Sequence, residues 1–131
     1  MLFRSITGDR IPFAATAHAM LGTISQYASR DGHAQSRQER QIIQVESVSL
    51  NDLLESHGAP ADIDFISIDT EGSELDILSH FDFQRWNVML FAVEHNLTEA
   101  GLELDKLMRR NGYERRFPGY PVIDAWYRRS N

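Results

Sequence analysis

Short apolar runs alternate with helical patterns along most of this chain. Such runs are typical of buried strands, and six consecutive apolar residues at 88–93 suit a strand that is covered on both faces of a parallel sheet. Strands that alternate with helices predict an α/β fold with right-handed crossovers, here followed by a C-terminal antiparallel hairpin. The expected strands are residues 42–45, 63–69, 88–93, 113–117 and 122–127, and the expected helices are residues 50–57, 98–111 and a segment from residue 73 onward.

Two of the predicted helix starts have the spacing of a capping box, in which a hydroxyl and an acid three residues later satisfy each other's backbone N–H groups. The pairs are Ser49 with Asp52 and Ser73 with Asp76. Residues 1–41 carry little periodicity apart from a short strand at 11–13. The sequence therefore predicts an irregular lead-in over residues 1–41 and an α/β core over residues 42–131.

Two neighbouring strands of the predicted sheet end on polar side chains. Because the carboxyl ends of adjacent parallel strands lie about 4.8 Å apart, the acids at these ends are expected to face one crevice. Such a crevice can orient a hydroxyl, accept its proton or hold a divalent cation through oxygen ligands. The residues concerned are Asp69, Glu71 and Gly72 after the first of these strands, and Glu94, His95 and Asn96 after the second.

Each of these residues also has a purely structural interpretation. Asp69 and Glu71 would favour the following helix, because negative charge is stabilised at the positive end of the helix dipole. Taken alone, His95 is more often a hydrogen-bonded loop histidine than a catalytic base. Asn96 can simply cap the next helix.

Composition narrows the classes of function without choosing one. The chain has 131 residues with 13 Lys and Arg against 19 Asp and Glu, and the net charge of −6 argues against nucleic acid or an anionic membrane as a partner. The chain has no cysteine, so disulfides, thiol catalysis and cysteine-bound zinc are excluded. No apolar stretch approaches the roughly 20 residues of a membrane span, and a cytoplasmic location is expected.

Five short motifs follow one another along the chain. They are residues 48–54 (Val-Ser-Leu-Asn-Asp-Leu-Leu), 63–74 (Ile-Asp-Phe-Ile-Ser-Ile-Asp-Thr-Glu-Gly-Ser-Glu), 93–96 (Val-Glu-His-Asn), 112–113 (Gly-Tyr) and 124–127 (Asp-Ala-Trp-Tyr). In this order and at this spacing they resemble the FkbM family of methyltransferases, over roughly residues 5–128. Ala125 departs from the pattern, because many relatives have a second Asp before Trp-Tyr.

The resemblance implies a class I, Rossmann-like methyltransferase sheet and the cofactor S-adenosylmethionine. It implies methylation of an oxygen on a small-molecule or sugar-like acceptor. A divalent metal held by Asp69, Glu94 and Asn96 is a further expectation, since metal-assisted O-methyltransferases place acids and an Asn at these strand ends. The implied site residues are Asp69, Glu71, Glu94 and His95 for catalysis, Asp69 and Gly72 for the cofactor, and Asn96, Asp124 and Trp126 for the acceptor.

The glycine-rich turn that cradles the cofactor in this class is not found before residue 42. The chain is therefore expected to be a single partial domain over residues 1–131, truncated at its N-terminus and equivalent to the C-terminal half of a methyltransferase. Such a chain should bind S-adenosylmethionine poorly by itself. Its strand at residues 63–69 should expose an apolar edge through which the chain self-associates.

Two other functions remain open from the sequence. One is a two-metal nuclease in which Asp69 and Glu71 hold the catalytic cations. The acidic balance of the chain counts against it. The other is a non-catalytic remnant or interaction module, which the missing cofactor half makes a serious alternative.

Overall fold

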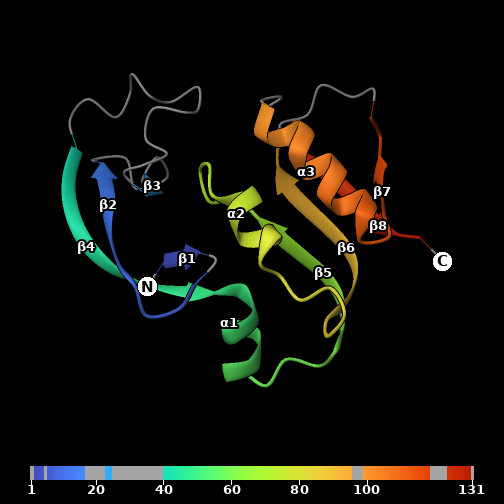
Figure 1. Ribbon diagram of the computed structural model, residues 1–131, viewed down its shortest axis with the longest axis horizontal. Coiled ribbons are helices and arrows are strands. Elements are labelled where there is room, and N and C mark those ends of the chain that lie inside the picture. The colour runs from blue at the N-terminus through green and yellow to red at the C-terminus, as the bar shows by residue number, and fades with distance from the viewer. Residues whose placement is uncertain are drawn as a thin grey trace.

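The computed structural model describes residues 2–4, 6–16, 23–24, 40–95, 99–118 and 124–130. Within them the chain forms two four-stranded sheets and three helices (Figure 1). The first sheet contains β1 (Leu2–Arg4), β2 (Arg10–Thr16), β3 (Thr23–Ile24) and β4 (Arg40–Ser49) in the order β1-β4-β2-β3. The second contains β5 (Asp62–Ile68), β6 (Asn87–Glu94), β7 (Tyr113–Arg116) and β8 (Asp124–Arg129) in the order β5-β6-β8-β7. The helices are α1 (Leu50–Ser56), α2 (Glu74–Ser79) and α3 (Glu99–Arg110).

The N-terminal part of the chain is more regular than the expected lead-in. The strand expected at residues 11–13 extends over all of β2, which pairs antiparallel with β4 from Arg10 opposite Glu46 to Thr16 opposite Arg40. β1 pairs parallel with the end of β4. In this sheet β4 pairs with segments that lie 24 to 45 residues earlier in the chain, and local hydrophobic alternation does not reveal such pairing.

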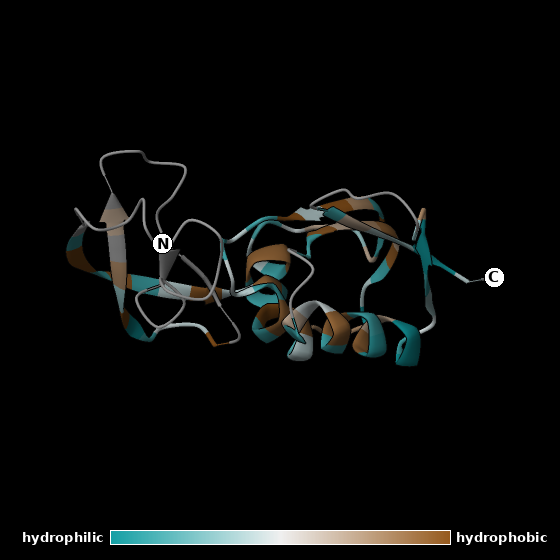
Figure 2. Cartoon of the chain, turned by 90° about the horizontal axis from the view of Figure 1, so that it is seen from above, coloured by the Kyte–Doolittle hydropathy of each residue, from teal (hydrophilic) through white to brown (hydrophobic). Residues whose placement is uncertain are grey.

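The second sheet carries the main core of the protein. β5 and β6 are parallel, and β8 runs antiparallel to both β6 and β7. The strands expected at residues 63–69 and 88–93 are confirmed with small shifts of their ends. Helices α1, α2 and α3 lie together on one face of this sheet (Figure 2). The core between them includes Leu78, Val88, Phe91, Val93, Leu104 and Met108, each at most 1% exposed.

One expectation about β6 is wrong. Its six apolar residues suggested a strand covered on both faces, but Met89 is 57% exposed. On the neighbouring strand Phe65 is 47% exposed. Phe65 lies opposite Leu90, on the face of the sheet that also carries Trp126. Met89 precedes Leu90 in the strand, so its side chain points to the other face. β5 lies at one end of the order of strands in its sheet.

The start of α1 follows the expected cap only in part. The Ser49 hydroxyl accepts a hydrogen bond from the Asp52 backbone N–H at 3.1 Å, as predicted. The Asp52 carboxylate does not return to the Ser49 N–H, which donates to the Thr7 hydroxyl at 2.8 Å. Instead this carboxylate accepts hydrogen bonds from the hydroxyls of Ser49 and Thr7, and these bonds lower the pKa of Asp52. The cap thereby ties α1 to the segment that precedes β2.

The second predicted cap is wrong. α2 begins at Glu74, and the Ser73 side chain makes no capping hydrogen bond. The Ser73 hydroxyl donates to the Thr70 hydroxyl at 2.8 Å instead. The residue that organises this helix start is Glu74, whose contacts form part of the candidate site.

Candidate active site at the carboxyl ends of β5 and β6

The parallel register of β5 and β6 brings the acidic strand ends together. Ile68 lies opposite Val93, so Asp69, which follows β5, and Glu94, the last residue of β6, lie side by side at this end of the sheet. One carboxylate oxygen from each of Asp69, Glu71 and Glu94 lies within 4.8 Å of the others. Asp69 is exposed, Glu71 is half-buried and Glu94 is buried. The three predicted acids therefore form one cluster, which we call the acidic edge.

The turn that carries Glu71 has an uncommon backbone. Glu71 has a φ of 56° and Gly72 has a φ of 112°, so two successive residues have positive φ angles. A non-glycine residue seldom adopts such an angle unless its surroundings hold it there. Gly72 was expected to allow a close backbone approach, and its positive φ is a conformation that glycine adopts without steric cost.

The buried carboxylate of Glu74 holds this turn. Its Oε1 accepts hydrogen bonds from the Thr70 N–H at 2.8 Å, the Thr70 hydroxyl at 2.9 Å and the Gly72 N–H at 3.1 Å. Glu74 is only 7% exposed. Sequence reasoning gave it no role, although an acid two residues after the glycine of a Thr-x-Gly turn is the signal that could have found it. Glu74 is thus a positioning residue for the acidic edge.

The residues predicted to bind the acceptor are Asn96, Asp124 and Trp126. Asp124 pairs with Glu94 in the register of β6 and β8, so a further exposed acid begins β8 beside the acidic edge. Trp126 pairs with Ala92 and stacks on Phe65 of β5, with ring centroids 6.0 Å apart and an interplanar angle of 17°. Asn96 lies outside the described residues, so its predicted role has no structural counterpart here.

His95 is buried beneath α3. Its Nε2 lies 3.2 Å from the Arg115 guanidinium and 3.5 Å from the Asp105 carboxylate. The other ring nitrogen, Nδ1, is buried and has no hydrogen-bond partner within the described part of the chain. This geometry matches the hydrogen-bonded loop histidine that the sequence left open.

The helix comes unusually close to this ring. A Cβ added at Gly101 of α3 would lie 2.5 Å from Cε1 of His95 and 2.7 Å from its backbone oxygen. Such distances are far shorter than a van der Waals contact, so only glycine fits at this point of the helix. Gly101 thereby fixes how tightly α3 covers His95.

Sequence reasoning missed the network that surrounds His95. Asp105 accepts hydrogen bonds from Arg115 at 2.9 Å and from the Tyr127 hydroxyl at 2.7 Å. Burial raises the pKa of Tyr127, and the Asp105 hydrogen bond raises it further. These residues come from α3, β7 and β8 and are separated by 10 to 22 positions in sequence. An acid at a half-buried helix position is the one local signal, and it is weak.

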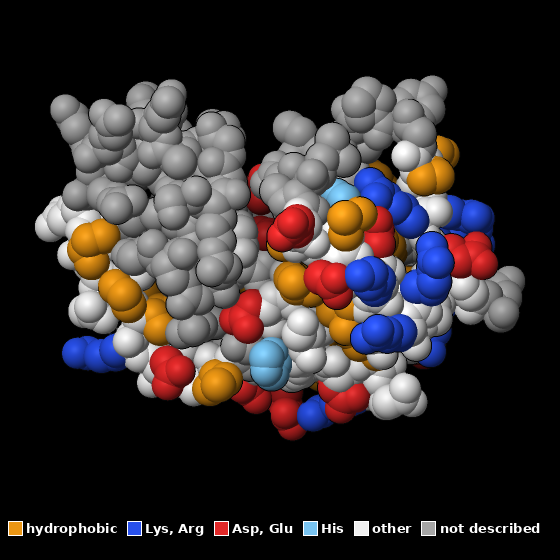
Figure 3. Space-filling view, turned by 45° about the horizontal axis from the view of Figure 1, so that its top comes forward, with side chains coloured by type: hydrophobic (Ala, Val, Ile, Leu, Met, Phe, Trp, Pro, Cys, Tyr) orange, Lys and Arg blue, Asp and Glu red, His pale blue; other side chains and the backbone are white. Residues whose placement is uncertain are grey.

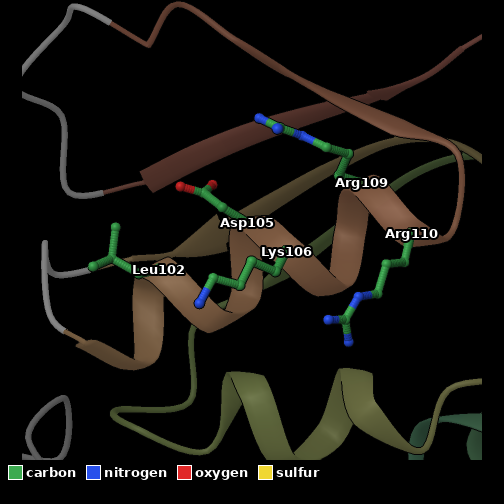
Figure 4. A pocket seen from close by; sticks show the side chains of 5 residues that line it. All are labelled: Leu102, Asp105, Lys106, Arg109 and Arg110. Carbon is green, nitrogen blue, oxygen red and sulfur yellow. The ribbon is translucent and has the colours of Figure 1, made fainter.

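The acidic edge offers the oxygen ligands that hard divalent cations prefer. Two of the three expected metal ligands, Asp69 and Glu94, lie in the acidic edge, together with Glu71. The third expected ligand, Asn96, lies outside the described residues. A separate hollow of about 390 Å³ lies along the outer side of α3. Figure 4 shows the side chains that line it, which are Leu102, Asp105, Lys106, Arg109 and Arg110. In the space-filling view basic side chains gather on the right-hand part of the molecule (Figure 3).

Comparison with known proteins identifies the family. The model of the methyltransferase FkbM domain matches residues 8–115, which is well over half of the 131 residues. The chain therefore belongs to the FkbM methyltransferase family, and the predicted family membership is confirmed. No curated protein and no solved structure matches the chain. Among the described residues, no helix has both the length and the apolar character needed to cross a bilayer.

Proposed function

We propose that this protein transfers a methyl group from S-adenosylmethionine to a hydroxyl oxygen of a small-molecule or sugar-like acceptor, at the acidic edge. Family membership supports methyl transfer as the class of reaction. The observation that carries the proposal is the convergence of Asp69, Glu71 and Glu94 at two parallel strand ends, with oxygens within 4.8 Å of one another. Open α/β sheets bind their ligands at such strand ends.

The acidic edge suits this cofactor chemically. S-adenosylmethionine supplies a methyl group activated by a sulfonium cation, and opposite charges a few ångströms apart attract each other appreciably near a protein surface. Asp69 and Gly72 are the proposed cofactor contacts. The glycine-rich turn of this class is not found before residue 42. Weak binding is therefore proposed, and low-micromolar affinity in a calorimetric titration would contradict it.

The acidic edge can also handle the acceptor proton. Methylation of a hydroxyl forms a carbon–oxygen bond while the carbon–sulfur bond breaks, and the hydroxyl proton must leave to a base. Glu71 and Glu94 are the proposed bases, with Asp124 and Trp126 orienting the acceptor. His95 was also expected to act as a base. Its ring is buried beneath α3, with Nε2 3.2 Å from the Arg115 guanidinium, so His95 does not stand among the proposed bases.

Radiolabelled methyl transfer tests this proposal. The full chain is incubated with methyl-labelled S-adenosylmethionine at millimolar concentration and a panel of hydroxyl acceptors, with and without EDTA. The wild type should label at least one acceptor, and Glu94→Gln should lower the rate about a hundredfold, as loss of a proton-transfer group does. Glu99→Gln, an exposed acid in the first turn of α3, is the matched control and should leave the rate unchanged. Labelling that survives in Glu94→Gln would refute the assignment.

A second assay tests the alternative that this protein is a two-metal nuclease. Three clustered carboxylates are also the ligand type of two-metal nucleases. Release of nucleotides from single-stranded DNA that requires Mn²⁺ and is lost in Asp69→Ala would favour that reaction over methyl transfer. Labelling of a hydroxyl acceptor that stops with EDTA would instead support methyl transfer with a bound divalent cation.

A further inference from the structure

The second sheet has a face that points away from the helices. Phe91 and Tyr127 pair across β6 and β8 and belong to the core under the helices (Figure 2). Since successive side chains of a strand point to alternate faces, the neighbouring pair Ala92 and Trp126 faces the other way. There Trp126 stacks on Phe65 of β5, which is 47% exposed. We call the side of the sheet that carries Phe65 and Trp126 the aromatic face.

The acidic edge adjoins one end of the aromatic face. Asp124 is paired with Glu94 in the register of β8 and β6, and it lies two residues before Trp126. Residues two apart in a strand share a face, so Asp124 and Trp126 point to the same side of the sheet, about 7 Å apart along the strand. The candidate site therefore continues from carboxylates onto a half-buried indole ring.

Two arginines lie beyond the rings on the aromatic face. Arg116 of β7 is opposite Trp126, and Arg128 follows Trp126 by two residues on β8. The two arginines are diagonal neighbours across the strand pair, a separation that long side chains can bridge. Both are exposed. They line a hollow of about 240 Å³ together with Glu114, Arg129 and Ser130.

This hollow has an excess of positive charge. Among the described residues that line it, three are arginines and one, Glu114, is an acid. The Glu114 carboxylate lies 3.7 Å from the Arg116 guanidinium, in an exposed ion pair. Arg128 takes part in no ion pair with any described residue. Because a guanidinium presents a planar fork of donors that matches a carboxylate or a phosphate, the hollow suits an anionic group.

We propose that the methyl acceptor is a hydroxylated ring compound that carries a carboxylate or phosphate and binds along the aromatic face. Its hydroxyl lies at the acidic edge, its ring lies on Trp126 and Phe65, and its anionic group lies between Arg116 and Arg128. Asp124 and Arg128 are four residues apart on β8, so the hydroxyl and the anionic group are at most about 14 Å apart. This inference rests on the proposed function, because it takes the acidic edge as the place of transfer.

The order of charges along the face fixes the direction of binding. The carboxylates at one end repel the anionic group of the acceptor, and the arginines at the other end attract it. Complementary charge of this kind selects partners and sets their register. The acceptor therefore presents its hydroxyl, and not its anionic group, to the acidic edge.

Binding of matched ligands tests the inference without relying on methyl transfer. Saturation-transfer NMR on the full chain gives dissociation constants for two sets of ligands. The sugar set is cellobiose, the corresponding uronic acid and the corresponding phosphate ester of its primary hydroxyl. The aromatic set is para-hydroxycinnamate and its neutral amide. In at least one set an anionic member should bind on the order of tenfold more tightly than the neutral member, because it gains hydrogen bonds to a charged group. The set that shows the preference tells a sugar acceptor from an aromatic one.

Arginine substitutions test where the anionic group lies. The double variant Arg116→Ala/Arg128→Ala should abolish the preference and leave the affinity for the neutral member unchanged. Trp126→Ala should weaken the binding of neutral and anionic members alike, because both lose the ring on which they stack. Arg110→Ala, which removes an exposed arginine of α3, is the matched control and should bind every ligand like the wild type. Circular dichroism checks that each variant is folded.

Three results overturn the inference: equal binding of neutral and anionic members in both sets, a preference that survives in the double variant, and no binding of any member at tens of millimolar. Failure of the proposed function has a different signature. In that case the preference and its loss in the double variant are observed, but the preferred ligand is not methylated. Methylation of neutral acceptors at a rate that the double variant shares would instead keep the proposed function and refute this inference.

Discussion

Replacing Glu74 by alanine should destabilise the turn that carries Glu71. The Glu74 carboxylate accepts hydrogen bonds from two backbone N–H groups and one hydroxyl, and the residue is 7% exposed. In Glu74→Ala the N–H groups of Thr70 and Gly72 lose their acceptor. The positive φ of Glu71 then loses the contacts on both sides that hold it.

The expected loss of stability follows from these contacts. A hydrogen bond to a charged group contributes about 1.5–3 kcal/mol, but the three bonds share one oxygen and are not additive. The turn is only partly buried, so water replaces some of the lost acceptor. The free energy of unfolding should therefore fall by about 2–4 kcal/mol in Glu74→Ala. Glu74→Gln keeps an acceptor oxygen at the same place and should lose roughly half as much or less, since only the charge is removed.

Urea denaturation followed by circular dichroism measures these differences. Glu99→Ala is the matched control, because Glu99 is also a first-turn acid but is exposed. Its stability should stay within about 0.5 kcal/mol of the wild type. Equal stability of Glu74→Ala and wild type would refute the reasoning. A loss in Glu74→Gln as large as in the alanine variant would also refute it, because the role of the acceptor oxygen would then be wrong.

Three further changes test other contacts. Gly101→Ala should destabilise the protein, because overpacking against His95 costs about 1–3 kcal/mol and the gain in helix propensity is only about 1 kcal/mol. An unchanged melting temperature would show that α3 can move away from His95 freely. Tyr113→Phe should cost about 1 kcal/mol in urea denaturation, since its hydroxyl donates at 2.7 Å to a buried backbone carbonyl of β6, and a stability gain would contradict this. Hydrogen bonds from Ser49 and a second hydroxyl lower the pKa of Asp52, so its stabilising effect is complete above the ordinary Asp pKa of about 3.9 and is lost as the pH falls through the lower folded value. Asp52→Asn should therefore flatten the acid limb of a stability–pH profile, and an identical limb would argue against the cap.

The acidic edge was predictable because it depends on two local patterns. The apolar runs of β5 and β6 mark their burial, and the parallel register carries Asp69 and Glu94 to the same end of the sheet. The strand and helix order of the second sheet follows from the same periodicities. The expected cover on both faces of β6 was wrong, because a run of apolar residues does not reveal what packs on each face.

The parts that were missed depend on contacts between distant residues or on backbone angles. The pairing of β2 with β4 joins segments that carry no strong alternation. The ring of His95 meets Arg115, which is 20 positions away, and no local pattern links the two. Glu74 was missed because its role depends on the positive φ of the turn, which makes three donors converge on one oxygen.

The central claim is that the acidic edge is the site of methyl transfer. Its most direct test compares the rate of methyl transfer to a labelled hydroxyl acceptor in the wild type and in Asp69→Asn, with both proteins shown to be folded. Asp69 is exposed at the end of β5 and its carboxylate oxygens make no described hydrogen bond, so the substitution should leave the fold intact. The account predicts transfer by the wild type and a loss of about a hundredfold or more in the variant. Equal rates in the two proteins would contradict it.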